Sequence, residues 1–419
     1  MRIENLRSDR KGDRARVTAT VIWEDCNRSA YDLYFETAVD FADYLVCNPD
    51  AFFLGCVIPA MHYGETRLFI DAEICPEVRN GMVTVMSWLR LWFRGGVGEL
   101  VRLETRTRGA LRQPAVERAG FFFSGGVDSF ATFRKNRLTV PPGHSRYFQD
   151  GVVAFGLDID DPQAFAHVLS HLSAVAKQAE IRLIPVYTNV YLPYRKEDAG
   201  NKFSFWMLEF HGAALAAIAH ALAGRLTNVS IASTGSIPIL RYLGAYNIPN
   251  IGTHPLLDHN FSSAELLIHH DGVELSRLDK IRLIADWDLA LNNLRVCNKF
   301  RQYSHDSLNC GRCEKCVRTK LALFALGALD RVNLFADRDL SIELVKAAIQ
   351  IAPSQPGEYT KAIYYWDLLE PLARNGRDDL ARVIRRKLRS ARRQGHWPVW
   401  MRFLVRKLRA LRRVVRPWR

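Results

Sequence analysis

An apolar run that ends abruptly in a glycine turn is the feature that most constrains the fold of this chain. The run covers Gly120 to Phe123, and it is followed by Ser-Gly-Gly-Val-Asp-Ser over positions 124–129. Such a run suits a buried strand, the two glycines allow a turn without Cβ atoms, and Val127 onward suits the first turn of a helix. The sequence therefore predicts a strand, a tight turn and a helix in immediate succession.

A turn of this kind can hold a phosphate chain. Unpaired backbone N–H groups and the helix dipole both point at the space in front of the helix. The hydroxyl groups of Ser124 and Ser129 would add donors beside the amides of Gly125 and Gly126, and Asp128 could hold Mg²⁺ or cap amides of the loop. A serine- and glycine-rich turn without a ligand is the alternative interpretation.

The spacing excludes two common nucleotide-binding motifs and matches a third. It is neither the Gly-x-x-x-x-Gly-Lys-[Ser/Thr] of Walker loops nor the Gly-x-Gly-x-x-Gly of dinucleotide-binding folds. It resembles the PP-loop of the ATP pyrophosphatases, whose pattern is Ser-Gly-Gly-x-Asp-Ser after the first strand. The resemblance implies that ATP is split into AMP and pyrophosphate and that AMP is placed on a substrate oxygen. It assigns ATP to Ser124, Gly125, Gly126, Val127, Asp128 and Ser129, with Ser124, Asp128 and Ser129 as catalytic residues.

Four cysteines form the second signal. Cys297 is followed by CGRCEKC, which places further thiols at Cys310, Cys313 and Cys316. Two Cys-x-x-Cys steps bring three sulfurs around a tight knuckle, and Cys297 can complete the tetrahedron that structural Zn²⁺ favours. An iron–sulfur cluster is the main alternative, because clusters also use closely spaced cysteines. These four cysteines are the candidate metal ligands.

Together the two motifs resemble the 7-cyano-7-deazaguanine synthase branch of the PP-loop superfamily. Enzymes of this branch join an SGGxDS loop to a knuckle of the form Cys, then Cys-Gly-x-Cys-x-x-Cys, followed by a helix with Arg, which here matches Arg318. The resemblance covers about residues 117 to 330. It implies that ATP adenylates a carboxylate, that ammonia converts it to an amide, and that a second activation dehydrates the amide to a nitrile.

The chain departs from that branch around the acceptor. The Tyr-Pro-Asp-Cys segment associated with the synthases has no equivalent, since the comparable stretch from Thr253 to Glu265 reads THPLLDHNFSSAE. We expect a small-molecule carboxylate and ammonia, or a partner that supplies ammonia, in nucleoside modification such as queuosine biosynthesis or in phage defence. The alternatives are a tRNA-thiolating PP-loop enzyme with an iron–sulfur cluster, and a non-catalytic nucleotide-binding subunit of a membrane-associated or defence complex.

Strand-like and helix-like patterns alternate between the two motifs. Val152–Leu157, Ile181–Val186 and Val229–Ala232 suit strands, whereas Ala164–Ala179 and Phe203–Ala223 suit helices. This alternation predicts an α/β fold with a doubly wound parallel sheet, which the resemblance identifies as the PP-loop or adenine nucleotide α-hydrolase type.

Ligands of such sheets gather at the carboxyl ends of the strands. Asp158, Thr234 and Gly235 follow two of the expected strands and therefore join the glycine turn as candidates for holding AMP. The histidine-rich segment from 254 to 280 could hold a substrate carboxylate with Arg277 or Lys280 as counter-charge, although polar loops of this kind are commonly just solvated.

Patterns outside the two motifs suggest the domain organisation. Ala15–Trp23 and Leu68–Ala72 suit strands and Gly81–Phe93 suits a buried helix, so the N-terminal part reads as an α+β module. We expect this module over 1–112, the ATP-binding domain with the knuckle over 117–330, a helical extension over 331–394 and a basic amphipathic tail helix over 395–419.

The net charge of +14 comes from one end of the chain. Of the 58 Lys and Arg and the 44 Asp and Glu, 16 and 2 lie between Gly376 and Arg419, so the rest of the chain holds 42 of each kind. Within 395–419, apolar residues recur at helical spacing between arginines, which suits an anionic membrane surface. Docking on the chain itself, pairing with another subunit, and binding to nucleic acid are the alternatives.

Cysteine usage and hydropathy suggest the compartment. Eight cysteines without a secretory signal favour a reducing environment, and no apolar stretch suits a membrane span. We therefore expect a cytoplasmic protein that the basic tail could attach to a membrane. Oligomerisation is compatible with the sequence.

Overall fold

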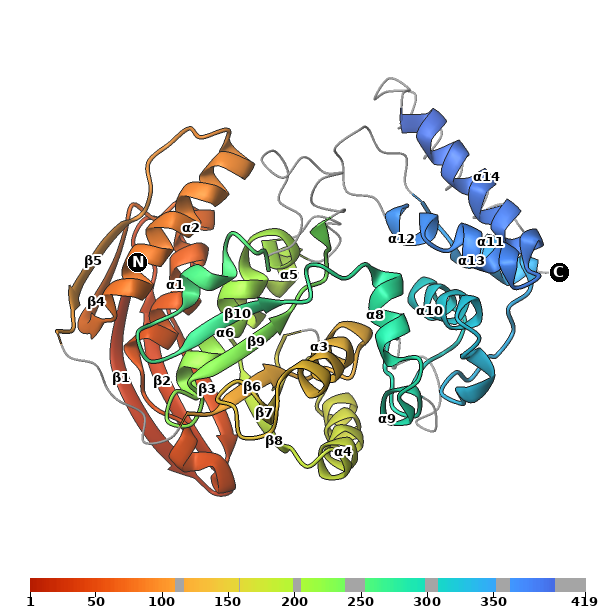
Figure 1. Cartoon of the computed structure of the whole chain (residues 1–419). Coiled ribbons are helices and arrows are strands. Elements are labelled where there is room, and N and C mark those ends of the chain that lie inside the picture. Colours follow the sequence, from red (N-terminus) through yellow and green to blue (C-terminus); the bar gives the residue numbers. More distant parts are fainter. Residues whose placement is uncertain are drawn as a thin grey trace.

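One ten-stranded sheet runs through the protein and carries helices on its faces (Figure 1). The computed structural model describes residues 1–109, 117–157, 159–198, 205–237, 253–297, 308–351 and 362–395. The strands are β1 (Arg2–Lys11), β2 (Arg14–Ile22), β3 (Tyr31–Ala38), β4 (Arg67–Ile74), β5 (Arg102–Thr107), β6 (Ala119–Phe122), β7 (Phe148–Phe155), β8 (Arg182–Thr188), β9 (Asn228–Ala232) and β10 (Leu267–Asp271).

Helices alternate with the strands from β6 to β9, and they dominate the chain after β10. The longer ones are α1 (Pro49–Tyr63), α2 (Pro76–Arg94), α3 (Val127–Thr139), α4 (Pro162–Gln178), α6 (His211–Ala221), α8 (Arg277–Ile284), α10 (Glu314–Ala325) and α14 (Asp378–Gly395). The shorter ones are η1 (Val39–Tyr44), η2 (Leu192–Tyr194), α5 (Arg195–Asp198), η3 (Trp206–Phe210), η4 (Asp258–Phe261), α9 (Asp288–Leu291), η6 (Leu329–Arg331), α11 (Ile342–Ala348), α12 (Ile363–Trp366) and α13 (Leu369–Arg374).

The expected α/β class is confirmed, and the sheet is mixed rather than wholly parallel. Its order is β10-β9-β6-β7-β8-β3-β2-β1-β4-β5, and six of the nine pairings between described strands are parallel. The five strands from β6 to β10 are parallel to one another, as the alternating pattern predicts. The antiparallel pairs join β1, β2 and β3 to one another and β3 to β8. The N-terminal strands therefore continue the same sheet, while the domain boundaries expected near residue 112 remain a prediction.

Alternating apolar residues give the sheet two buried faces. Val152 and Ile184 pack in a core with α1, α2 and α6, whereas their neighbours Val153 and Leu183 pack on the other side with α3 and α4. Side chains that alternate in this way project to opposite faces of a strand. The second core continues through α8 and α10 into the helices α11 to α14.

The sheet has a topological switch point between the neighbouring strands β6 and β9. From β6 the chain proceeds through β7 to β8 on one side, and then returns to place β9 and β10 on the other side of β6. In an open α/β sheet, the crevice beyond the carboxyl ends of the two central strands is the usual ligand site. The segments after β6 and β9 border this crevice.

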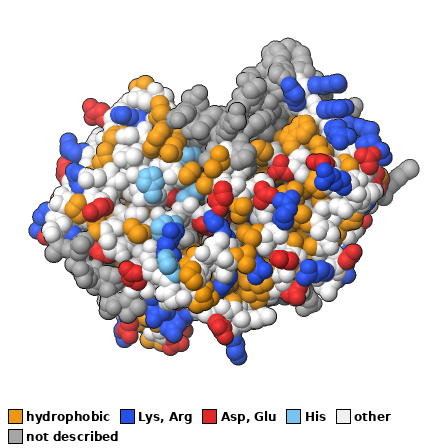
Figure 2. Space-filling model, in the orientation of Figure 1, with side chains coloured by type: hydrophobic (Ala, Val, Ile, Leu, Met, Phe, Trp, Pro, Cys, Tyr) orange, Lys and Arg blue, Asp and Glu red, His pale blue; other side chains and the backbone are white. Residues whose placement is uncertain are grey.

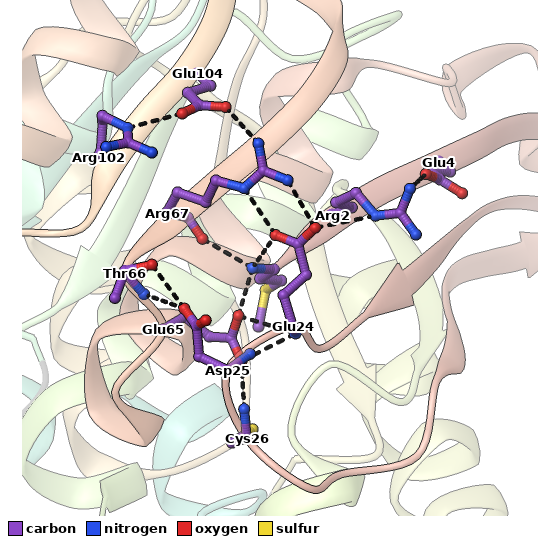
Figure 3. A network of polar contacts seen from close by, with 11 residues as sticks. Arg2, Glu4, Glu24, Asp25, Cys26, Glu65, Thr66, Arg67, Arg102 and Glu104 are labelled. Carbon is purple, nitrogen blue, oxygen red and sulfur yellow. Dashed lines mark hydrogen bonds and ion pairs between the residues drawn. The ribbon is translucent and has the colours of Figure 1, made fainter.

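A polar network ties the N-terminal strands together (Figure 3). The amino group of Met1 is buried, contacts the carboxylate of Glu65 and lies 3.1 Å from Glu24 Oε2. Arg67 then bridges Glu24 and Glu104, with 2.8 Å to an oxygen of each. The Arg67 side chain, which donates hydrogen bonds to Glu24, holds the pKa of that carboxyl below its usual range.

Two helices predicted from the sequence are described only in part. The helix expected over Phe203–Ala223 begins as a π-helical turn, η3, before it continues as α6. The tail helix expected over 395–419 falls outside the described residues except for Gly395, where α14 ends. Among the helices that are described, none combines the length and the apolar composition that crossing a bilayer requires.

Candidate functional site

The glycine turn predicted from the sequence follows β6 directly and leads into α3. Gly125 has φ +73°, a left-handed conformation that favours glycine, whereas Gly126 is extended with φ −83°. The amide of Gly126 donates to Ser124 Oγ at 3.3 Å, and Ser129 Oγ donates to the carbonyl of Gly126 at 3.1 Å. The side chains of Ser124 and Ser129 thus both form hydrogen bonds with the backbone of Gly126, which stabilises the turn.

The first turn of α3 is open to a ligand. The amides of Val127, Asp128 and Ser129 lie in the first turn of the helix, where backbone amides have no carbonyl partner within the helix. No side chain among the described residues caps this N-terminus either. Ser124 is exposed and Ser129 is buried, and their hydroxyl oxygens lie 3.4 Å apart beside this turn. This arrangement offers hydroxyl and amide donors to an anion in front of the helix.

Asp128 is paired with two cations rather than left free. Arg277 Nη1 lies 2.5 Å from one of its carboxylate oxygens, and Lys280 Nζ lies 3.2 Å from the other. Burial by itself would raise the pKa of Asp128, but the charges of Arg277 and Lys280 outweigh it and lower that pKa to about 2. The carboxylate is therefore ionised and already neutralised by its neighbours.

Lys280 also joins the glycine turn to the second turn at the carboxyl end of β9. Its ammonium donates to the carbonyl of Ser233 as well as to Asp128. Ser233 Oγ donates to the carbonyl of Gly235 at 2.6 Å, which shapes the turn that contains the half-buried Thr234. Lys280 thus joins the turn that contains Thr234 and Gly235 to Ser124–Ser129. Asp158 lies outside the described residues.

Arg295 braces the glycine turn from a distant part of the chain. Its backbone amide donates to the carbonyl of Gly125 at 2.8 Å, and its guanidinium donates to the carbonyl of Ser124 at 3.2 and 3.3 Å. A Cβ atom on Gly125 would lie 3.7 Å from Arg295 Cβ and 3.0 Å from Leu172 Cδ2. The turn is consequently enclosed on the side away from the crevice.

The four predicted metal ligands converge. Their sulfur atoms all lie within 4.8 Å of one another, and Cys313 is the residue just before α10. Gly311 has φ +75°, and a Cβ there would lie only 2.0 Å from the carbonyl oxygen of Asp337, so the knuckle needs glycine at this position. The cluster of Cys297, Cys310, Cys313 and Cys316 could hold a metal ion such as zinc.

The thiols of Cys313 and Cys316 are hard to ionise without a cation beside them. A hydrogen bond with Cys297, together with burial, raises the pKa of Cys313 to about 11. Contact with Cys297 and Cys313 also raises the pKa of Cys316. A bound metal would supply the positive charge that stabilises thiolates in this position.

Asn309 connects the cysteine cluster to the segment that braces the glycine turn. Its buried side chain accepts from the amides of Val296 and Cys297 at 2.7 and 3.1 Å, and donates to the carbonyl of Leu294 at 2.8 Å. Arg295 lies inside the segment that Asn309 holds. Sequence analysis missed both residues, and the position of Asn309 directly before Cys310 was the signal that could have found it.

The histidine-rich segment is divided between two places. His254 and His270 both contact the buried Asp258, through the His254 amide at 3.0 Å and through His270 Nδ1 at 2.8 Å. Burial lowers the pKa of His254 to about 4, so its ring stays neutral and packs against Trp92. These histidines form a structural cluster, whereas Arg277 and Lys280 from the end of the same segment reach the glycine turn.

Comparison of the chain with models of known protein families, with curated proteins and with solved structures gives no match. The geometry of the crevice and of the cysteine cluster is therefore the basis for assigning a function.

Proposed function

We propose that the protein is an ATP-dependent adenylating enzyme of the PP-loop type, resembling 7-cyano-7-deazaguanine synthase. The observation that carries the proposal is the placement of the Ser-Gly-Gly-Val-Asp-Ser turn at the switch point, next to the turn after β9 and within reach of Arg277 and Lys280. Phosphate-binding loops of α/β proteins occupy this position.

The described residues divide into groups with different roles. Ser124, Ser129 and the amides of Gly125, Gly126 and Val127 would hold the phosphates that leave as pyrophosphate. Arg277 and Lys280 would offset the charge that develops on that leaving group, because fixed cations in a partly buried crevice stabilise such charge strongly. The turn with Thr234 and Gly235 has little side-chain bulk and would accept the ribose or adenine.

The proposed reaction has two steps. An oxygen of the substrate carboxylate attacks the α-phosphorus, the bond between this phosphorus and the bridging oxygen of the β-phosphate breaks, and pyrophosphate leaves. Ammonia then attacks the carbonyl carbon and releases AMP, which gives the amide. Each oxygen of Asp128 contacts one cation, so charge neutralisation is assigned to Arg277 and Lys280, and Mg²⁺ would share this carboxylate with them.

The cysteine cluster favours one zinc ion over an iron–sulfur cluster. Four sulfur pairs lie 3.4, 3.5, 3.7 and 3.8 Å apart. A tetrahedron with Zn–S bonds of about 2.3 Å places its sulfurs about 3.8 Å apart. Thiolates bound to different irons of a cluster lie farther from one another. The tRNA-thiolating alternative, which needs such a cluster, is accordingly the weaker one.

A binding role without turnover is the second candidate function. The observation that favours it is the ion pairing of Asp128, because Arg277 and Lys280 already supply fixed positive charge for an anionic nucleotide beside the turn. A subunit of this kind would bind ATP and leave it intact.

Product analysis separates these functions. The protein is incubated with ATP, ammonium and pooled small metabolites, and AMP, ADP, pyrophosphate and phosphate are quantified. We expect equal amounts of AMP and pyrophosphate, a loss of at least about tenfold in Ser129→Ala, and no change in the exposed control Ser170→Ala on α4. ADP with phosphate, or no nucleotide binding, would overturn the proposal. Tight ATP binding without AMP under any condition supports the binding role instead.

Metal analysis of the same preparation determines which metal the four cysteines bind. We expect one zinc per chain in a colourless protein. A brown preparation with iron would favour thiolation.

A further inference from the structure

The exposed face of α14 carries a row of arginines that the proposed function does not use. The opposite face packs on α11 and α13 through Leu380, Ala381, Ile384 and Leu388, all of which are buried. The exposed face borders a hollow of about 570 Å³, whose lining residues are Arg382, Arg385, Arg386, Arg389, Ser390, Arg393 and Gln394. Figure 2 shows Lys and Arg side chains gathered over the part of the surface where α14 lies in Figure 1.

Most of this charge is uncompensated. Arg382 contacts Asp378, one turn before it. Within the described part of the chain, Arg385, Arg386, Arg389 and Arg393 make no ion pair and no hydrogen bond. Since the chain before Gly376 holds equal numbers of basic and acidic residues, this face is a local excess rather than part of a generally basic surface. An anionic partner would relieve the repulsion within the row.

The spacing of the arginines places their charges in a row along one face of α14. Arg382, Arg386, Arg389 and Arg393 follow one another at four, three and four residues. At a rise of about 1.5 Å per residue, successive arginines lie about 5 to 6 Å apart along the helix axis. A nucleic-acid duplex carries one charge for about every 1.7 Å of its axis, so a row of this length can meet several phosphates at once.

The composition of α14 decides between classes of partner. Its exposed face has no large hydrophobic side chain that could enter a bilayer, since none of the exposed large hydrophobics of the described residues lies on this helix. It has no aromatic residue, although protein interfaces and single-stranded nucleic-acid sites rely on aromatic side chains. Arginine is also the side chain whose planar fork matches phosphate oxygens.

We propose that the arginine face of α14 binds the phosphate backbone of double-stranded nucleic acid. Contacts of this kind position a duplex without reading its sequence. The opposite side of the same helix shares one apolar core with residues of α3 and α10. The proposal does not depend on turnover of ATP.

Fluorescence anisotropy with a labelled 20-base-pair duplex tests this proposal on the full-length chain. The variant Arg386→Gln/Arg389→Gln/Arg393→Gln is compared with Arg10→Gln/Arg102→Gln/Arg106→Gln, which removes the same charge from the exposed arginines of β1 and β5. Each lost phosphate contact reduces the slope of log affinity against log salt by about 0.9. We expect the α14 variant to lose about 2.7 from that slope and about tenfold or more in affinity, while the control is unchanged.

Circular dichroism and metal content confirm that both variants fold. An unchanged affinity and slope in the α14 variant would overturn the proposal, and so would an equal loss in the control, because binding would then follow net charge alone. Vesicles with a phosphatidylserine fraction form a further arm. Loss of vesicle binding in the α14 variant with duplex binding intact would assign the face to a membrane and overturn the nucleic-acid proposal.

Discussion

At the scale of single residues, the ionised state of Asp128 couples the candidate site to pH. Its folded-state pKa of about 2 lies below the value of about 3.9 for an exposed aspartate. A depressed pKa means that the ionised carboxylate stabilises the fold above pH 4 and that this contribution disappears as the pH falls from about 4 to 2. The size of the contribution is on the order of 2 kcal/mol.

Asp128→Asn is therefore expected to lower the free energy of unfolding by on the order of 2 kcal/mol at pH 7 and by almost nothing near pH 2. Denaturant unfolding across this pH range measures the difference. Asp286→Asn is the control, because Asp286 is 76% exposed and lies 3.7 Å from Arg134, and we expect no change there. A constant difference between wild type and Asp128→Asn at all pH values would contradict the ion pairing described for Asp128.

Gly125 and Gly126 provide a second contrast between neighbouring residues. Gly125→Ala places a side chain at φ +73° and brings its Cβ to 3.0 Å from Leu172 Cδ2. Left-handed backbone costs an L-residue about 1 to 2 kcal/mol, so we expect at least this loss of stability. Gly126→Ala keeps an ordinary extended conformation with 3.4 Å to Ser124 Oγ, and we expect a loss below about 0.5 kcal/mol. Thermal and denaturant unfolding would show equal losses if the turn had another conformation.

The residues of this site that belong to local motifs could be predicted from the sequence. The residues that reach the site through long-range contacts could not. Ser124–Ser129 and the four cysteines could be found because their chemistry lies within a few residues of sequence. The partners of Asp128 are 149 and 152 residues away, and Arg295 is 171 residues from Ser124. No local pattern indicates which cation meets which carboxylate across such distances.

At the scale of elements, the segment from Leu294 to Cys297 links the cysteine cluster to the glycine turn. Cys297 belongs to the cluster, Arg295 supports the carbonyls of Ser124 and Gly125, and Asn309 holds the segment by three hydrogen bonds. A fourth bond ties the same Asn309 amide to the carbonyl of Leu334. Order in the cysteine cluster should therefore be transmitted to the turn.

Asn309→Ala is expected to weaken binding of adenine nucleotides by about tenfold although all four cysteines remain. The reason is that two backbone amides lose a buried acceptor, which costs about 1 to 3 kcal/mol for each unsatisfied group and loosens Arg295. Calorimetric titration with a non-hydrolysable ATP analogue measures the affinity, and removal of the metal with a chelator should have the same effect.

The matched control for this variant is Asn136→Ala. Asn136 is also buried, and its amide holds the carbonyl of Arg146 and the amide of Phe148 at the far end of α3. We expect a similar loss of stability with unchanged nucleotide affinity. Equal effects of the two variants on affinity would mean that the segment transmits nothing.

Some strands could not be predicted from the sequence because their composition lacks the usual apolar pattern. β1 reads RIENLRSDRK and has a single buried residue, Ile3, so it lacks the apolar alternation that indicates a strand. Backbone pairing with β2 and β4, together with ion pairs such as Arg7 with Asp32, stabilises it instead. By contrast, β2 and α4 were predictable because their buried residues follow the expected period.

At the scale of the whole molecule, the junction between β3 and β8 joins the N-terminal strands to the parallel strands in one sheet. Phe35, Glu36 and Thr37 pair with Thr188, Tyr187 and Val186, and Thr37 Oγ1 donates to the carbonyl of Pro185 at 2.6 Å. One apolar core contains residues of β1 to β3, α1 and α2 together with residues of β7, β8 and β9. Sequence analysis treated 1–112 as a module of its own because strand pairing between distant segments leaves no local signal.

The N-terminal strands and the strands from β6 to β10 are therefore expected to unfold as one cooperative unit. Phe35→Ala removes a fully buried ring in contact with Phe52 and should cost about 3 to 5 kcal/mol. Hydrogen exchange followed by mass spectrometry should show an equal loss of protection in peptides from β2 and from β7, because both report the same global opening. Val39→Ala, at the exposed start of η1 directly after β3, is the control with an expected change below about 0.5 kcal/mol. Loss of protection confined to β1, β2 and β3 would show that the N-terminal part opens on its own, and the shared sheet would then be two stability units joined at β3 and β8.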